Sequence, residues 1–276
     1  MTKPVLKNAS YILVHTPDMI IHNGTTYQME KLGNPDSEFL KNVGNFIRNY
    51  EEVVNYAPNQ VYIGNKKPEE LNDVATPWFE NPVQGTREGR FGEIMPQDEF
   101  IGMLKIADSF DLVKLTADFS KAVVEKLKAH ELFSDAELEK FKDSEEIDSI
   151  KTFVNEHHAE GLYHMGELVG CVKRAHEVDN SLTAHIMFEN LVVKASGVLA
   201  VKHLMKNSSV KADEIEYVIE CSEEACGDMN QRGGGNFAKS IAEACSFTNA
   251  TGSDTRGFCA GPTHALINAA ALVKSG

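Results

Sequence analysis

The stretch from Gly257 to Val273 contains no Asp, Glu, Lys or Arg. It begins Gly-Phe-Cys-Ala-Gly-Pro and continues with small and aliphatic residues, a pattern that predicts a helix starting close to Cys259. A helix that is apolar all round must be covered on every side. The stretch therefore predicts a central helix in a large core.

Cys259 lies at the predicted start of this helix. The N–H groups of a first helical turn lack partners within the helix, and the helix dipole is positive there, so the thiolate form of a cysteine is favoured. The N–H groups of Ala260 and Gly261 are placed to stabilise an oxyanion. Cys259 is thus the candidate nucleophile. The alternative is a small apolar filler, the usual role of a buried cysteine outside disulfides.

Composition excludes several classes of protein. The chain has 276 residues, 42% of them hydrophobic, which is enough for a sizeable core. A formal charge of −14 argues against nucleic acid or an anionic membrane as the main partner. No apolar run is long enough to span a membrane, and the N-terminus lacks the apolar region of a signal peptide.

The five cysteines are odd in number and have no C-x-x-C spacing, so they predict neither a disulfide framework nor a zinc ribbon. This usage is typical of a reducing cytoplasm. We expect no bound metal and no bound cofactor.

Three regions differ in pattern. Residues 1–95 are rich in Pro, Asn and Gly, which predicts extended segments and turns, with two strands at 9–15 and 19–22 joined by a turn. Residues 96–185 have apolar residues at helical spacing, which predicts a mostly helical insertion. Within it, Ser134 and Glu137 have the spacing of a capping box.

Residues 186–276 read as an α/β core that ends in the helix after Cys259. Apolar patterning predicts a helix at 188–206, a strand at 215–221, a helix at 237–245 and a short segment at 254–258. The fold class is therefore α/β.

This succession, with Cys-Ala-Gly before a small-residue helix ending in Ala-Ala-Leu-Val-Lys-Ser-Gly, resembles the thiolase fold and, within it, β-ketoacyl-ACP synthase III. The resemblance implies the N-terminal half of a five-layered αβαβα fold. It also implies that Cys259 is the acyl-accepting nucleophile. The second half of that fold, which supplies the catalytic histidine, has no counterpart in these 276 residues.

A closer resemblance covers the whole chain. The segments 15–26, 58–65 and 76–82 are similar to the β subunits of component C (protein C) of glycine/sarcosine/betaine reductase complexes. The resemblance implies partnership with an α subunit and with selenoprotein A in a hetero-oligomer. It further implies conversion of a carboxymethyl selenoether, through an acetyl thioester, to acetyl phosphate, with phosphate as co-substrate.

Two other patterns suggest binding sites. His157, Glu160, His164 and Glu167 have the spacing of one helical face and could ligate a metal, but such faces are usually solvated. The loop Gly233, Gly234 and Gly235 precedes a predicted helix and could cradle an anion, although triple glycines are more often mobile loops.

Two alternatives remain beside the reductase subunit. One is a condensing enzyme of the ketoacyl synthase type that uses acyl-CoA or acyl-ACP. The other is a subunit without catalytic function, in which Cys259 only packs and the chain holds the other components. A chain without the second half is expected to be inactive alone, and to self-associate through its uncovered helix.

Overall fold

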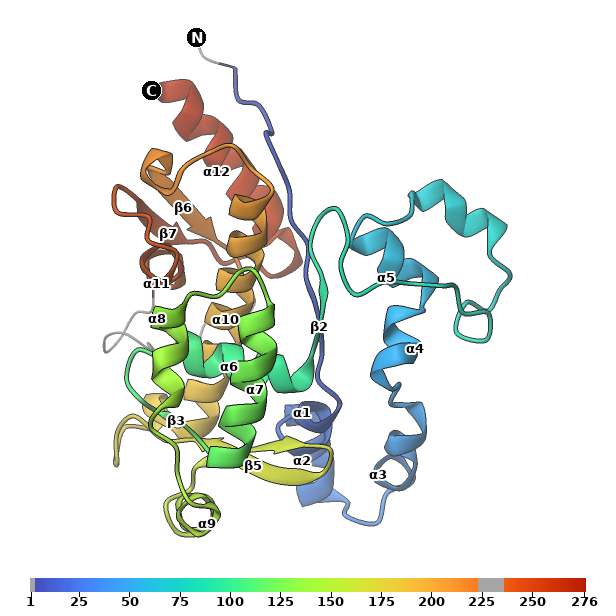
Figure 1. Ribbon diagram of the computed structural model, residues 1–276, viewed down its shortest axis with the longest axis vertical. Helices are drawn as coiled ribbons and strands as arrows, with labels where there is room; N and C mark the ends of the chain where they lie inside the picture. The colour runs from blue at the N-terminus through green and yellow to red at the C-terminus, as the bar shows by residue number, and fades with distance from the viewer. Residues whose placement is uncertain (1–2, 223–235) are drawn as a thin grey trace.

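Helix α10 (Ala184–Lys206) runs through the middle of the computed structural model, which describes residues 3–222 and 236–276 (Figure 1). Thr183 caps it by accepting a hydrogen bond from the N–H of Ile186. Within the described residues, α10 alone is long and apolar enough to cross a membrane, and half of that stretch is buried inside the fold. The helix predicted at 188–206 is confirmed.

The core surrounds α10. Helices α6 (Gln97–Ala107) and α11 (Phe237–Ala244) pack against it, and α7 (Ala117–Ala129) covers α6. Every residue of α6 is buried. The apolar spacing that predicted helices in residues 96–185 therefore reports a real core, and the helix at 237–245 is confirmed as well.

Among the residues that the structure describes, three small sheets complete the fold, and the α/β class is confirmed. Two sheets are parallel pairs and one is an antiparallel sheet of three strands in the order β3-β5-β4. The five-layered thiolase arrangement and the domain boundaries at 95 and 185 stay predictions. The strands are β1 (Leu13–His15), β2 (Ile94–Pro96), β3 (Val113–Leu115), β4 (Glu160–His164), β5 (Glu167–Val172), β6 (Tyr217–Glu220) and β7 (Thr251–Asp254).

The predicted entry of two neighbouring strands is wrong in its second half. Residues 17–22 form helix α1 (Pro17–His22), and β1 pairs in parallel with β2 instead of forming a hairpin. Pro17 occupies the first turn of α1, where the fixed φ of proline suits a helix and its missing N–H is no loss. Residues 16–18 therefore begin a helix, whereas their sequence predicts a turn between two strands.

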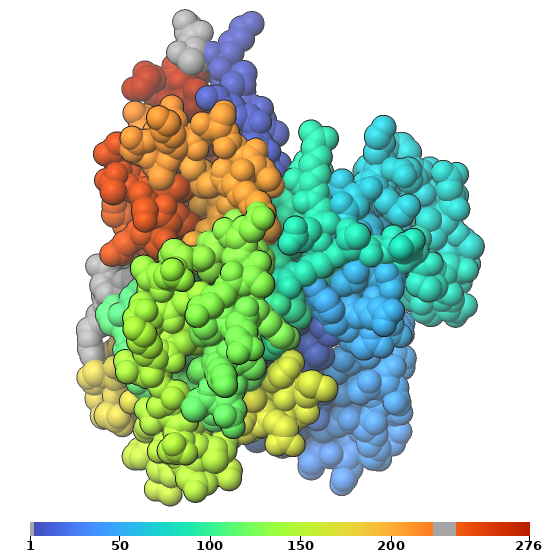
Figure 2. Space-filling view, viewed as in Figure 1, coloured from blue at the N-terminus to red at the C-terminus, as the bar shows by residue number. Residues whose placement is uncertain are grey.

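The prediction of extended chain up to residue 95 is also wrong for its middle part. Short helices follow α1, namely α2 (Thr25–Gly33), α3 (Glu38–Asn42), α4 (Tyr50–Val54) and α5 (Ala57–Tyr62). Three of them, α3, α4 and α5, lie in a lobe beside the main body (Figures 1 and 2). Side chains of Ser37 and Asn49 cap two of them.

The region 96–185 mixes helices with the antiparallel sheet. The capping box of Ser134 and Glu137 is confirmed at the start of α8 (Asp135–Leu138), and α9 (Ile147–Glu156) follows it. The tight turn between β4 and β5 has positive φ at Met165 and Gly166, as a two-residue hairpin requires. A largely helical insertion was therefore an incomplete description.

The β4–β5 hairpin also contradicts the prediction that four possible metal ligands share one face of a helix. His157 ends α9, whereas Glu160 and His164 lie on β4 and Glu167 begins β5. Strand periodicity replaces the helical spacing that would have aligned these side chains. The helical-face interpretation is wrong.

The C-terminal part is a βαβ unit followed by helix α12 (Gly261–Ser275). Strand β6 pairs in parallel with β7, and α11 connects them across one face. The strand predicted at 215–221 is confirmed as β6. Helix α12 was predicted to be buried, but in this structure only Gly261 of it is buried, and Leu266 and Ile267 are 68% and 60% exposed.

Candidate active site

The candidate nucleophile lies beyond the carboxyl ends of the parallel strands β6 and β7. Cys221 follows β6 directly, and the segment after β7 leads through Arg256 to Cys259. In open α/β sheets, ligands bind outside the carboxyl ends of parallel strands. The fold thus places Cys259 where such a fold presents its reactive groups.

Cys259 is exposed and lies in a 3-10 turn, Phe258–Ala260, directly before α12. Phe258 has a φ of +48°, an outlier conformation for a bulky residue, and its side chain is 79% exposed. Strain of this kind concentrates at functional sites, because the surrounding structure must hold it. The exposure of Cys259 argues against its alternative reading as a buried filler.

The predicted oxyanion donors are engaged within this turn. The N–H of Ala260 donates to the carbonyl of Gly257 at 3.0 Å, and the N–H of Gly261 donates to the carbonyl of Phe258. Their role as oxyanion donors stays a prediction, and it requires the turn to open when an acyl group is bound.

Arg256 holds the segment before the nucleophile. Its guanidinium contacts Glu220 at 2.7 Å and Asp254 at 3.5 Å, so it bridges the ends of β6 and β7. Asp254 also accepts hydrogen bonds from the N–H groups of Phe237 and Ala238 in the first turn of α11. A carboxylate is favoured there because the helix dipole is positive. These ion pairs and hydrogen bonds connect the ends of β6 and β7, the start of α11 and the loop before Cys259.

Two further groups lie close to this turn. A Cβ on Gly261 would be 3.5 Å from the Cβ of Cys221, and a Cβ on Gly257 would be 3.1 Å from Nδ1 of His264. Burial raises the pKa of the Cys221 thiol, and the neighbouring Glu220 carboxylate adds to the rise. The thiolate of Cys221, which is the nucleophilic form, is therefore disfavoured.

Two apolar grooves approach Cys221. One, of about 770 Å³, runs between α1, α10 and β6. The other, of about 1000 Å³, separates β6 from α12 and is lined by Pro262, Ala265 and Leu266 among others. The predicted anion loop Gly233, Gly234 and Gly235, and also Cys226, lie outside the described residues.

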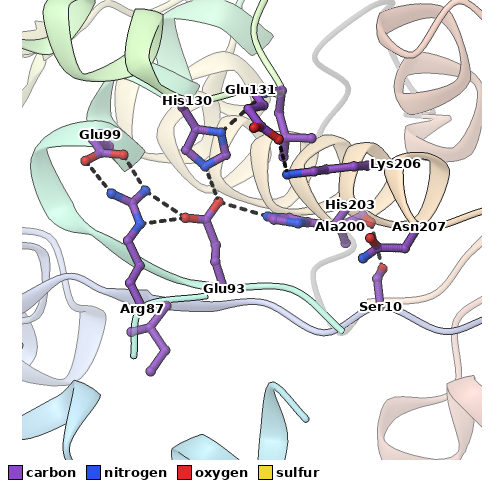
Figure 3. Close-up of polar contacts among 12 residues, drawn as sticks. Ser10, Arg87, Glu93, Glu99, His130, Glu131, Ala200, His203, Lys206 and Asn207 are labelled. Atoms are coloured by element: carbon purple, nitrogen blue, oxygen red, sulfur yellow. Dashed lines mark hydrogen bonds and ion pairs between the residues drawn. The ribbon is translucent and has the colours of Figure 1, made fainter. Parts of the chain in front are cut away.

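A second polar centre lies in the core, away from any motif that the sequence displays. Glu93, directly before β2, is fully buried between Arg87 on one side and two histidines on the other (Figure 3). Its Oε1 accepts hydrogen bonds from Nε2 of His130 at 2.8 Å and of His203 at 2.9 Å. Its Oε2 accepts from Nε and Nη2 of Arg87 at 2.9 and 2.7 Å.

The charges of this centre are strongly coupled. Burial alone would raise the pKa of Glu93, but the hydrogen bonds from His130 and His203 and the charge of Arg87 outweigh it, so the pKa lies well below its ordinary value. Arg87 also binds the buried carboxylate of Glu99. Burial alone would lower the pKa of Arg87, but the hydrogen bonds to Glu99 and the charge of Glu93 outweigh it, so the pKa is raised.

Glu93, His130 and His203 offer donor atoms of the kind that bind transition metals. The ligand atoms of Glu93, His130 and His203 lie within 4.8 Å of one another. An ionised carboxylate only accepts hydrogen bonds, so both Nε2 atoms carry protons in this arrangement. The N–H of Leu132 donates to Nδ1 of His130, which agrees with that tautomer. The centre is complete as a hydrogen-bonded network.

Comparison with known proteins identifies the relationship. No family model and no solved structure matches the chain. The chain is 57% identical, over 279 aligned residues, to the glycine/sarcosine/betaine reductase complex component C subunit beta of Peptoclostridium acidaminophilum. This chain is a homologue of that component C β subunit. The match covers all of the chain and 54% of the relative, so the chain spans about half the length of the subunit it matches.

For this component C β homologue, the sequence predicts Cys259 as the nucleophile, which stays a prediction, but it does not indicate the Glu93 centre. Its members come from the segment before β2, from the first turn of α6, from the end of α7 and from the last turn of α10. Single histidines and carboxylates this far apart carry no spacing signal. The five residues between Glu93 and Glu99 include Gln97 and Asp98, so no apolar pattern marks this pair either.

Proposed function

We propose that this chain acts as a β subunit of component C in a glycine, sarcosine or betaine reductase complex, and that Cys259 carries the acetyl group. The identity to the component C β subunit supports the assembly. The observation that carries the chemistry is the exposed Cys259 in a strained turn beyond the ends of two parallel strands. An accessible cysteine before a helix is a good acyl acceptor.

We propose two steps: acetyl-Cys259 forms, and phosphate then releases the acetyl group. In this release step, phosphate attacks the carbonyl carbon of acetyl-Cys259. The new bond joins a phosphate oxygen to that carbon, and the carbon–sulfur bond breaks. The sulfur leaves as the thiolate and takes up the phosphate proton, so the products are acetyl phosphate and the Cys259 thiol. The tetrahedral oxyanion formed on the way needs N–H donors, for which Ala260 and Gly261 are the candidates.

The acetyl group is proposed to come from the carboxymethyl selenoether of selenoprotein A. The bond between selenium and the methylene carbon breaks, and selenium forms a bond to a thiol sulfur of the same selenoprotein, which is oxidised. The carboxymethyl carbon is reduced to a methyl group. The carboxyl carbon joins the sulfur of Cys259, and its OH group leaves as water with one thiol proton. The other thiol proton ends on the new methyl group.

The assembly is proposed to contain the α subunit of component C and selenoprotein A, in a cytoplasmic hetero-oligomer. Phosphate acts as co-substrate and no bound cofactor is required. Helix α12 supports a multi-subunit arrangement, because its exposed residues Leu266, Ile267, Leu272 and Val273 form an apolar surface of the kind that other protein covers.

The test uses the subunit reconstituted with its α partner and incubated with isotope-labelled acetyl phosphate. Peptide mass mapping is expected to place acetyl on Cys259, and the variant Cys259→Ala is expected to lose it. Cys221→Ala is the matched control, because Cys221 lies near the same turn but its thiol pKa is raised by burial and by the Glu220 carboxylate. Acetyl found only on the α subunit would contradict the carrier role.

The exposed apolar face of α12 also favours a second candidate, a subunit that holds the others together without chemistry of its own. In that case the Cys259→Ala complex keeps full turnover in an acetyl phosphate assay. Loss of turnover with intact assembly, measured by size-exclusion chromatography, would reject this second candidate.

A further inference from the structure

A small cavity of about 270 Å³ lies on the opposite side of α10 from the apolar groove beside β6. Its walls come from the chain after α6, from α8 and the 3-10 turn after it, from α10 and from α11. Six polar side chains line it: those of Ser109, Lys140, Lys194 and Ser240, and the carboxylates of Glu137 and Glu243. None of these residues lies in the segment around Cys259.

Lys194 is the unusual member, because its charge is buried. The residue is 3% exposed, and its Nζ donates to Oγ of Ser109 at 2.9 Å. An ammonium group has three N–H donors, and no carboxylate of the described residues forms an ion pair with this one. Burying a charge without a partner is costly, so the cavity beside Lys194 requires an acceptor.

Lys140 brings a second ammonium to the same cavity. Its Nζ donates to the carbonyls of Ile106 at 2.5 Å and of Asp108 at 2.6 Å, which leaves one N–H over. Burial, together with the charge of Lys140, lowers the pKa of Lys194 to about 8, against the opposing effects of Glu243 and Asp108. The two cations are thus close enough to repel each other.

Ser240, on α11, is a second and independent indication that the cavity binds a ligand. The residue is 3% exposed, and its Oγ is buried without a hydrogen-bond partner among the described residues. Native proteins seldom leave such a group unsatisfied. Its hydroxyl can donate to an anion while the two ammonium groups supply the counter-charge.

The acidic neighbours do not neutralise these lysines directly. The carboxylate of Glu137 binds Lys202 at 2.8 Å and accepts from Ser134. The carboxylate of Asp108 accepts from the N–H groups of Phe110 and Val113. The remaining acidic residue at the wall, Glu243, is exposed.

We propose that this cavity binds a small oxyanion of the phosphate type. The Nζ groups of Lys194 and Lys140 and the hydroxyls of Ser240 and Ser109 hold its oxygens. Charge-assisted hydrogen bonds of this kind are stronger than neutral ones, which suits a small ligand in a small cavity. The site is separate from the acyl-transfer step, because it shares no residue with the turn around Cys259.

Isothermal titration of the chain with inorganic phosphate tests the proposal, with glycerol 3-phosphate in a second arm. We expect saturable binding that Lys194→Met weakens by about tenfold or more, equivalent to about 1.4 kcal/mol. Lys140→Met and Ser240→Ala are expected to weaken binding as well. Lys121→Met, on the exposed side of α7, is the matched control and should leave binding unchanged.

Circular dichroism verifies that each variant is folded, and Lys194→Gln replaces Lys194→Met if the latter is not. Binding of inorganic phosphate alone assigns the cavity to the free anion, whereas binding of the monoester as well assigns it to a phosphoryl group of a larger molecule. Absence of saturable binding in both arms, or unchanged binding in the Lys194 variants, would overturn the proposal. Retention of binding in Cys259→Ala separates this outcome from any failure of the acyl-transfer mechanism.

Discussion

At the scale of single residues, the cysteines differ sharply in their surroundings. Cys259 is exposed, whereas Cys171 is fully buried. Burial raises the pKa of Cys171 to about 12 and that of Cys245 to about 11. Since the thiolate is the reactive form, chemistry at sulfur is directed to the turn before α12.

We therefore expect selective alkylation of the native protein. Iodoacetamide at neutral pH should modify Cys259 first and leave Cys171 and Cys245 intact, as followed by peptide mass mapping against time. The protein unfolded in urea is the control, because all of its thiols should react. Equal rates for Cys171 and Cys259 in the folded protein would contradict the structure.

Glu93 is the residue on which the buried polar centre depends. Its carboxylate contacts Arg87, His130 and His203 at once. We expect Glu93→Gln to lower the free energy of unfolding by about 1–3 kcal/mol, since an amide cannot accept all the hydrogen bonds that Arg87, His130 and His203 donate, and buried donors are left without acceptors. Urea denaturation measures this change. The exposed Glu131→Gln serves as control and should unfold as the parent does.

The same residue predicts a dependence of stability on pH. Because the pKa of Glu93 is lower in the folded protein than its ordinary value of 4.5, its contribution is fully present above that value. The contribution should be lost as the pH falls below 4.5 toward the folded-state pKa. Melting temperatures at pH 7, 4 and 3 should fall less steeply for Glu93→Gln than for the parent.

At the scale of elements, the sequence predicted the helices themselves but not how closely two of them pack. A Cβ on Gly102, in α6, would lie 2.6 Å from Cγ1 of Val123 and 3.0 Å from Cδ1 of Leu127, both on α7. This glycine therefore sets how closely the two helices approach. Apolar spacing indicated both helices, but it could not indicate the distance between them.

Gly102→Ala is expected to destabilise the protein by about 1–3 kcal/mol through overpacking, as measured by denaturant unfolding. Gly33→Ala in α2 is the matched comparison, because nothing lies within 4 Å of a Cβ placed there. That substitution should be neutral or slightly stabilising, since alanine favours a helix over glycine. A stable Gly102→Ala protein would show that α6 and α7 can separate at little cost.

Elements with a local signal were predicted well, and those decided by distant contacts were not. The capping box at Ser134 and the helix around Leu191 depend on neighbouring residues, so their patterns sufficed. Residues 19–22 are as apolar as a strand, yet Pro17 and the pairing of β1 with β2 make them a helix. The Glu93 centre joins four segments, and nothing local in any of them announces it.

At the scale of the whole molecule, the uncovered face of α12 governs behaviour in solution. Leu266 and Ile267 are mostly exposed on a helix with one charged residue, Lys274. We expect the chain alone to self-associate, and the double variant Leu266→Lys with Ile267→Lys to shift it toward monomer in light scattering. Lys substitutions at the exposed Met29 and Leu32 of α2 provide the control. A parent chain that is monomeric at high concentration would contradict this expectation.

The parallel pairing of Leu13 with Ile94 has a consequence for the order of folding. These two residues are distant in sequence, so the chain must close a long loop before their hydrogen bonds form. The β4–β5 hairpin needs only a local turn. Pulse-labelling hydrogen exchange should therefore find β4 and β5 protected early and β1 late. Helices α2 to α5 lie between β1 and β2 in the sequence, so the segment that contains them is joined to the folded core at one end only until β1 pairs with β2. The strand nearest the N-terminus is therefore expected to form late.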